Sequence, residues 1–216
     1  MKRYAEFRNL IEVDHPLIAD RLTRLREEKT GTASFRNILS HISLLLSYAV
    51  TSELKPSTRK IQTPICEMEA PCLGEPMPSI IPVLRAGLGF SDSLMQLMPE
   101  ASVGHIGVMR NETTHRPEEY LVRLPKDIGQ RYILTDPMLA TGYSAAHAID
   151  VLNENGIEDE RIIMMSLVAA PEGVKVMQDK HPKVLIYTAA LDDHLNENAY
   201  IVPGLGDAGD RLFGTV

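Results

Sequence analysis

Cysteine is scarce in this 216-residue sequence, and no segment of it has the pattern of a leader or a membrane span. Cys66 and Cys72 are spaced neither as a redox motif nor as a zinc site, so we expect two free thiols in a cytoplasmic protein. The longest apolar run of the N-terminal half, at 42–50, is interrupted by serines and is too short to cross a bilayer. Residues 1–6 lack the apolar core of a signal peptide, and we expect no membrane partner.

Basic runs and the common nucleotide-binding signatures are absent as well. Lys and Arg number 22 against 29 Asp and Glu, the formal charge is −7, and no run of five basic residues occurs. Electrostatic binding to nucleic acid is therefore not expected. No Gly-Lys-Ser/Thr is present, which argues against a P-loop ATPase or kinase, and the seven histidines show no paired zinc spacing.

The chain does contain apolar segments that alternate between the helical and the strand period. Helical spacing predicts two opening helices at 16–28 and 34–54, and the apolar stripe of the second is wide enough to face a sheet or a partner subunit. Further helices are predicted at 89–98, 144–155 and 172–180. Strands are predicted at 80–84, 105–109, 132–134, 161–168 and 184–188, with a strand-like alternation also at 61–65 and a proline-bracketed loop at 71–78.

This alternation predicts an α/β fold in which a parallel sheet is covered by helices on both faces. Hydrophobic residues make up 44% of the chain, enough for a large core. We expect one domain over residues 1–216, with residues 1–58 forming an N-terminal helical extension packed on it. Ligands of such sheets bind at the carboxyl ends of the strands, so the loops after Leu84, Met109, Leu134 and Val168 should share one rim.

The most informative stretch is Arg131–Ser144, where a short apolar strand is followed by an acid and a small-residue loop. Gly142 permits a tight backbone, and the amide N–H groups at the start of the next helix would point at one anion. Thr141 and Ser144 add hydroxyl donors, while Asp136 can accept from sugar hydroxyls. A phosphate beside a ribose fits this pattern. The alternative is a plain strand-to-helix turn in which Gly and Ser serve only as turn and cap residues.

Three more segments carry a similar signal. The strand end at Leu84 is followed by Arg85 and by two glycines, which suits a loop approaching phosphate oxygens. The polar stretch 110–120 begins with another arginine and has the length of a loop. The segment 200–216 has four glycines, two acids and the apolar anchors Leu212 and Phe213, so we expect irregular backbone that presents amide and carbonyl groups to a flat polar base.

The motif Asp136-Pro-Met-Leu-Ala-Thr-Gly142 resembles the phosphoribosyl-pyrophosphate (PRPP) motif of type I phosphoribosyltransferases, in the form typical of the uracil-specific family. The resemblance runs over nearly the whole chain and includes 84–89 and 203–209. It implies a parallel-sheet core flanked by helices, with N-terminal helices and a mobile hood or hairpin at 110–120. The PRPP-binding residues that it implies are Arg85, Arg110, Asp136, Pro137, Met138, Leu139, Ala140, Thr141, Gly142, Tyr143, Ser144 and Asp207.

The resemblance also implies an activity, the transfer of phosphoribosyl from PRPP to N1 of uracil, which gives UMP and pyrophosphate. Mg²⁺ is the implied cofactor, reached by Asp207 through water. Arg85, Arg110 and Asp207 are the implied catalytic residues. The uracil-binding residues implied are Ile201, Gly206, Asp207 and Ala208. With uracil and PRPP as its small-molecule partners, such a protein is expected to be a homo-oligomer, a dimer or a tetramer.

Two departures and two alternatives accompany this interpretation. Thr135 stands where many type I enzymes have the first of two adjacent acids, and Tyr143 stands where a small residue is expected, so its side chain could crowd the phosphate. One alternative function is a PRPP- or UMP-sensing regulator of pyrimidine genes that binds RNA, against which the acidic balance counts. The other is transfer to a purine base, whose sites commonly stack the base on an aromatic ring.

Overall fold

The computed structural model describes residues 1–110 and 117–215, with the backbone alone at Arg110 and Pro117. Its helices are α1 (Pro16–Arg26), α2 (Thr32–Thr51), α3 (Leu88–Leu97), α4 (Tyr143–Glu154), α5 (Pro171–Lys180) and α6 (Ala208–Phe213), with a short 3-10 turn at Asp159–Arg161. Its strands are β1 (Lys2–Arg3), β2 (Leu10–Glu12), β3 (Pro56–Gln62), β4 (Glu67–Leu73), β5 (Ser79–Leu84), β6 (His105–Arg110), β7 (Pro117–Arg123), β8 (Tyr132–Thr135), β9 (Met138–Leu139), β10 (Ile162–Ala169), β11 (Leu185–Leu191), β12 (His194–Leu195) and β13 (Ile201–Val202).

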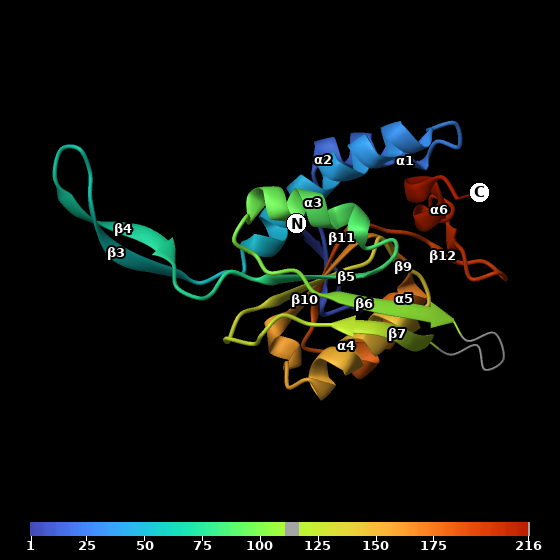
Figure 1. Cartoon of the computed structure of the whole chain (residues 1–216). Helices are drawn as coiled ribbons and strands as arrows, with labels where there is room; N and C mark the ends of the chain where they lie inside the picture. Colours follow the sequence, from blue (N-terminus) through green and yellow to red (C-terminus); the bar gives the residue numbers. More distant parts are fainter. Residues whose placement is uncertain (111–116, 216) are drawn as a thin grey trace.

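The main sheet has the strand order β1-β2-β11-β10-β8-β5-β6-β7, and β9 pairs with β10 beyond the end of β8 (Figure 1). Every pairing from β2 to β6 is parallel, and only the edge strands β1 and β7 run antiparallel to their neighbours. The expected α/β fold with a mostly parallel sheet is confirmed. The carboxyl ends of β5, β6, β8 and β10 consequently lie along one edge.

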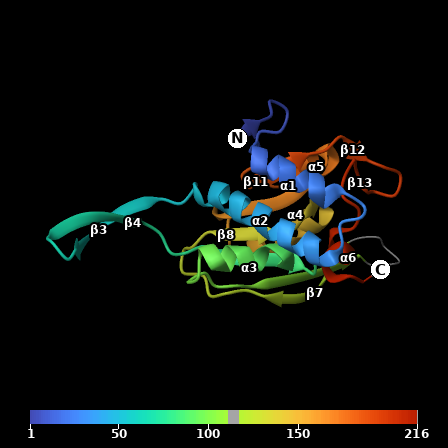
Figure 2. The ribbon, with the colours of Figure 1, turned by 90° about the horizontal axis from the view of Figure 1, so that it is seen from above.

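Successive residues of the central strands point into two separate cores. In β8, Ile133 belongs to the core under α1, α2 and α3, while Tyr132 and Leu134 belong to the core under α4 and α5. β10 alternates in the same way, with Ile163 on the first side and Met164 on the second. Seen from above, α1, α2 and α3 cover one face of the sheet (Figure 2). Both faces are therefore buried, as near-continuous apolar strands require.

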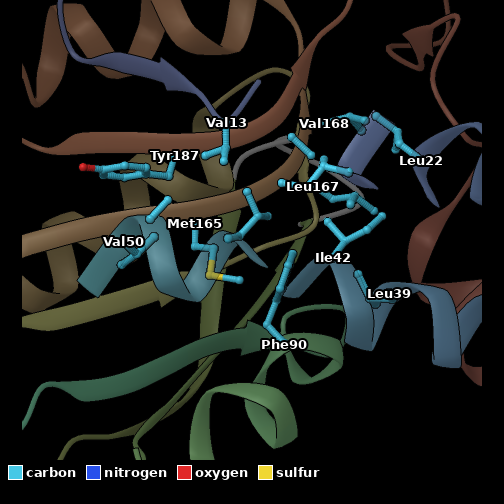
Figure 3. Packing of buried hydrophobic residues seen from close by; sticks show 14 of the residues in the cluster. Val13, Leu22, Leu39, Ile42, Val50, Phe90, Met165, Leu167, Val168 and Tyr187 are labelled. Carbon is cyan, nitrogen blue, oxygen red and sulfur yellow. The ribbon is translucent and has the colours of Figure 1, made fainter. Parts of the chain in front are cut away.

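Helix α2 contributes the largest share of the first core. Phe35, Leu39, Ile42 and Leu46 are fully buried along one side of it, and Figure 3 shows Leu39 and Ile42 near Phe90 and the β10 side chains. The helix tolerates the buried Ser43 because its hydroxyl donates to the Leu39 carbonyl at 2.7 Å. Although α2 is apolar, no helix within the described residues is both long and apolar enough to cross a bilayer.

Several elements differ from the sequence prediction. The alternation at 61–65 was placed too late, since β3 ends at Gln62, and the expected proline-bracketed loop is partly strand, since β4 includes Pro71. β3 and β4 form a hairpin that projects from the body of the molecule (Figures 1 and 2). Most of its residues are exposed on both faces, so the alternation of buried and exposed positions on which strand prediction relies is missing.

The strands β1, β2 and β7 were not predicted either. β2 (Leu10–Glu12) lies between the edge strand β1 and β11 and pairs with β11 in parallel, so the N-terminal segment contributes to the sheet as well as to the helices. β7 begins at Pro117, within the stretch expected to be loop to Tyr120, and pairs with β6. Strands this short or this polar give no periodic signal.

The carboxyl ends of β5 and β8 are held together by a close backbone contact. Gly87, which follows β5, lies against the main chain of Thr135 at the end of β8, and the Thr135 hydroxyl donates to the Gly87 carbonyl at 3.0 Å. Thr135 is fully buried. A carboxylate in its place would face that carbonyl oxygen without a proton to share, which gives a physical reason for threonine at this position.

Gly87→Ala should therefore destabilise the protein. A Cβ at this position would overlap the Thr135 carbonyl oxygen and lie 2.6 Å from the Val83 nitrogen, and neither backbone group can move freely. We expect a loss of about 1–3 kcal/mol or more in the free energy of unfolding, measured in urea. Gly31→Ser is the control, because a Cβ there meets nothing within 4 Å and serine is a good helix cap. Equal stabilities of the two variants would contradict the close contact.

Candidate active site

Three segments that are distant in sequence meet at the carboxyl edge of the sheet: the loop 84–89 after β5, the loop 136–144 after β8, and the segment 201–213. The amide of Ala208 donates to the sulfur of Met138 at 3.4 Å, which joins the last two. The guanidinium of Arg85 lies 5.5 Å from the centre of the Phe213 ring, which joins the first and the last. The structure thus brings together most of the residues named from the sequence.

The loop 136–144 is shaped as an anion cradle. It passes through β9 and turns at Gly142, whose φ of +80° is a left-handed conformation that favours glycine, directly into α4. Gly142 also packs against α5, where a Cβ would come 2.6 Å from the Gly173 carbonyl oxygen. The first intrahelical bond of α4 runs from the Ala146 amide to the Gly142 carbonyl at 2.9 Å. The amides before Ala146 have no acceptor within the helix and point out of its start.

The side chains of this loop differ in exposure. Thr141 is half-buried and Ser144 is exposed. Tyr143, the residue expected to crowd the phosphate, is 54% exposed at the first position of α4. Its ring is therefore not packed into the loop, and the backbone keeps its turn despite the large side chain.

Asp136 begins the loop and is electrostatically the most perturbed group of the site. Its carboxylate accepts from the Met138 amide at 3.3 Å, while its own amide donates to the Met165 carbonyl at 3.2 Å. Burial raises the pKa of this carboxyl to about 7, an effect that the Met138 N–H opposes and the nearby charge of Asp207 reinforces. Asp136 and Asp207 therefore face the same small region.

The segment 201–213 is more regular than the sequence predicted. The expectation of irregular backbone is wrong for its second half, because Ala208–Phe213 form α6, capped by Asp207, whose side chain accepts from the Asp210 amide at 2.9 Å. Only 203–207 is irregular. Ile201 and Ala208 are buried, whereas Gly206, with φ +78°, and Asp207 are exposed. The short helix follows from a capping acid placed before the apolar pair Leu212 and Phe213.

Three arginines fix this segment to the N-terminal helices, and sequence reasoning missed all three. Arg26 donates to the Gly204 carbonyl at 2.6 Å, and Arg36 donates to the Leu212 carbonyl at 2.6 Å. Arg211 reaches back to the Glu27 carbonyl at 2.7 Å. Their partners are backbone carbonyls or residues more than 160 positions away, so no local spacing in the sequence could have revealed them.

The fourth segment, at 110–120, is described only in part. Arg110 ends β6 and its backbone pairs with Pro117, while most of the mobile hood predicted at 110–120 falls on 111–116, outside the described residues. Behind it, Glu119 of β7 and His147 of α4 approach to 2.6 Å. This contact lowers the pKa of Glu119, although a backbone hydrogen bond contributes more.

A preformed metal cage is not part of the site. Among the residues that the structure describes, no group of three or more His, Cys, Asp and Glu side chains is arranged to hold a metal ion. Asp136 and Asp207 offer two carboxylates to one region, and their mutual repulsion is what a cation would relieve. This suits a cation that arrives with an anionic ligand and keeps most of its water, as Mg²⁺ does.

A parallel sheet with the phosphate-type loop (136–144) after its central strand β8 and an arginine loop (84–89) beside it is the arrangement that the sequence resemblance led us to expect of the class of type I phosphoribosyltransferases. Comparison with known proteins narrows the class. The profile of the family described as uracil phosphoribosyltransferase matches residues 12–215. The chain belongs to the uracil phosphoribosyltransferase family.

Individual relatives agree with this assignment. The uracil phosphoribosyltransferase of Burkholderia thailandensis is 56% identical over 215 residues, which cover 100% of this chain and 99% of that protein. Its counterpart from Burkholderia mallei (strain SAVP1) is 55% identical over the same coverage. The solved structure of the AQ2163 protein from Aquifex aeolicus superposes with a TM-score of 0.88 at 33% identity, covering 94% of this chain and 97% of that one.

The raised pKa of Asp136 predicts how stability depends on pH. Because the folded pKa is about 7 and the ordinary value is 3.8, the folded protein binds the proton more tightly, and this group lowers stability as pH rises from about 4 to 7. Asp136→Asn removes this titration and keeps the acceptor for Met138. Relative to wild type, its free energy of unfolding should rise by about 2–3 kcal/mol between pH 5 and pH 8.

Urea unfolding of both proteins without ligands at the two pH values measures this difference. Asp179→Asn on the exposed side of α5 is the matched control and should show no comparable change. A stability difference between Asp136→Asn and wild type that is the same at pH 5 and pH 8 would refute the raised pKa.

Proposed function

We propose that this protein transfers the phosphoribosyl group of PRPP to N1 of uracil, releasing UMP and pyrophosphate. The observation that carries the proposal is the contact between the phosphate-type loop and the segment 201–213, made by Met138 and Ala208. A nucleotide product needs one site for a ribose phosphate and an adjoining one for a base. The names of the relatives support uracil as that base.

The loop after β8 supplies the ribose 5-phosphate site. The first amides of α4 and the hydroxyls of Thr141 and Ser144 hold the phosphate, with 137–143 as its backbone frame. Asp136 accepts from the ribose hydroxyls. Its carboxyl has a pKa of about 7, so hydroxyl donors that favour the ionised form lower the cost of its burial when PRPP binds.

Pyrophosphate is the leaving group, and its charge grows as the bond to ribose C1′ breaks. Arg85 is exposed beside the cradle, with its guanidinium held over the Phe213 ring, and serves the pyrophosphate oxygens together with Arg110. Mg²⁺, when bound, neutralises part of the same charge. Asp207 would hold the ion through a water molecule, since its Oδ1 already caps the Asp210 amide.

The segment 201–208 reads the base with backbone groups. The Ala208 amide currently donates to a thioether sulfur, a weak acceptor that a uracil carbonyl can replace. Gly206 leaves the adjacent backbone open, and the Ile201 main chain completes the edge. Asp207 is exposed between Gly206 and Ala208, so it would polarise the base while N1 attacks C1′.

The assembly and location of the protein are part of the proposal. We infer a homo-oligomer, a dimer or a tetramer, because the β3–β4 hairpin projects from the body and exposes Ile65 at 90% and Met68 at 44%. The free thiols of Cys66 and Cys72 support a reducing, cytoplasmic setting. Residues 1–216 act as one domain, since α1 and α2 share a core with the central strands.

Turnover should require PRPP, Mg²⁺ and uracil together. Incubation with a panel of bases, followed by measurement of pyrophosphate release, is expected to give product with uracil only. Cytosine exchanges a donor and an acceptor on the edge that the backbone reads, which can cost a factor of about 10⁴ or more. Comparable turnover with hypoxanthine or adenine would overturn the choice of uracil, and cytosine within about tenfold of uracil would overturn backbone readout.

Thr141→Ala and Ser144→Ala should each weaken PRPP binding and leave the fold intact. Each variant removes one hydrogen bond to a charged phosphate, worth about 1.5–3 kcal/mol, or roughly 10- to 150-fold in the dissociation constant. Titration calorimetry with PRPP and Mg²⁺ measures it. Thr58→Ala, on the exposed face of the hairpin, controls for loss of a threonine hydroxyl elsewhere. Unchanged affinity in both loop variants would show that the loop is only a structural turn.

A further inference from the structure

Gly204 is one of the points at which 201–208, the proposed base-reading segment, is fixed to the rest of the protein. Its amide donates to Oδ2 of Asp192 at 2.9 Å, and its carbonyl accepts from Nη1 of Arg26 at 2.6 Å. The backbone N–H and C=O of Gly204 are therefore both hydrogen-bonded to a single Arg–Asp pair, which we call the clamp. Gly204 adopts φ +57° in a turn so tight that a Cβ would overlap the Ile201 carbonyl oxygen.

The pair that holds Gly204 is itself rigid. Arg26 contacts Asp192 through both terminal nitrogens, at 2.7 Å to Oδ2 and 2.5 Å to Oδ1. The Asp192 side chain is only 4% exposed, and its amide donates to the Ala169 carbonyl at 2.8 Å, which ties it to the end of β10. Arg26 comes from the last turn of α1. Helix α1, the end of β10 and the residue that follows β11 thus converge on Gly204.

This arrangement is not explained by stability alone. A buried ion pair recovers little more than the cost of removing its charges from water, and well-packed apolar residues often do as well. What the pair adds is direction, because a two-pronged guanidinium and a carboxylate fix the orientation of the peptide groups that they contact. Ile201 precedes the clamped turn and Gly206 follows it, so their relative placement depends on Gly204.

We propose that Arg26 and Asp192 are positioning residues for the base: through Gly204 they hold 201–208 in the conformation that reads the edge of the pyrimidine. The inference rests on the proposed function. Neither side chain belongs to the residues proposed to contact the base or PRPP, and the loop 136–144 has its own supports in β10 and Gly173. Loss of the clamp should therefore affect base recognition while leaving PRPP binding intact.

Arg26→Lys and Asp192→Asn test this with small changes. Lysine keeps the charge but cannot make the two-pronged contact, and asparagine loses one of the two carboxylate oxygens. The KM for uracil should rise about tenfold or more, and the preference for uracil over cytosine should fall. The dissociation constant of PRPP with Mg²⁺ should stay within about twofold. Thermal unfolding is followed in parallel.

The matched controls are Arg161→Lys and Asp127→Asn. Arg161 also contacts an aspartate through both terminal nitrogens, but at the amino-terminal edge of the sheet. These variants should leave the KM for uracil unchanged. The double variant Arg26→Leu/Asp192→Leu removes the buried Asp192 charge together with its partly exposed partner, so no buried carboxylate is left unpaired and the variant should fold. It should nevertheless lose uracil recognition, because Gly204 loses both partners.

The outcomes distinguish a failure of the proposed function from a failure of the positioning role of Arg26 and Asp192. If wild type does not turn over uracil, the proposed function fails and this inference fails with it. If wild type is active and the clamp variants keep the wild-type KM for uracil, or lose PRPP affinity to the same extent, the positioning role alone is overturned. A rise in the KM for uracil that the Arg161 and Asp127 controls reproduce at equal thermal stability also overturns it.

Discussion

The backbone of Gly87 and the carbonyl of Thr135 lie too close for any side chain to come between them, and this contact governs the layout of the site. The ladder pairs β5 with β8 as far as Pro82 and Thr135, and the contact keeps the chain close beyond that point, so the loops that leave the two strands share one rim. Arg85 and Asp136 stand on either side of the contact. A larger residue at 87 would separate the phosphate-type loop from its arginine, whatever the loops themselves contained.

Charge is distributed over this rim in a way that suits an incoming polyanion. Two carboxylates, Asp136 and Asp207, lie near enough to interact electrostatically, and the exposed guanidinium of Arg85 lies over the Phe213 ring. Without a ligand the acids repel each other, and one of them holds its proton unusually tightly. A ligand that brings hydroxyl donors, phosphates and its own cation satisfies every one of these groups, which neither phosphate nor base alone could do.

The sequence was informative about features that depend on residues only a few positions apart. The central strands and the helices α3, α4 and α5 follow from apolar periodicity, and Asp136, Thr141 and Gly142 were found because a strand, an acid and a small-residue turn follow one another within a few positions. The arginine of the loop after β5 was inferred in the same way, and the resemblance to a known family added the roles of Arg110 and of the residues near Gly206. The family and the fold class then agreed with the comparisons.

The elements that could not be predicted from the sequence depend on contacts that produce no apolar periodicity. The β3–β4 hairpin buries neither face, β2 is three residues long, and α6 needs Asp207 as its cap before its helical character can be recognised. The clamp of Arg26 and Asp192 on Gly204 could not be predicted from the sequence for another reason. An arginine at the end of one helix and an aspartate after a strand look like ordinary surface charges until the fold places them on the same peptide groups.

The arginine contacts also determine when the site can form. Arg26 bonds to a carbonyl 178 residues away, and Arg211 bonds to one 184 residues away, whereas β9 of the phosphate-type loop pairs with a strand only 30 residues further on. Contacts of such separation close a loop of nearly the whole chain, and their entropic cost is met only after the sheet exists. We therefore expect 201–208, the segment proposed to read the base, to dock last during folding and to detach first during local opening, while the loop 136–144 keeps its shape.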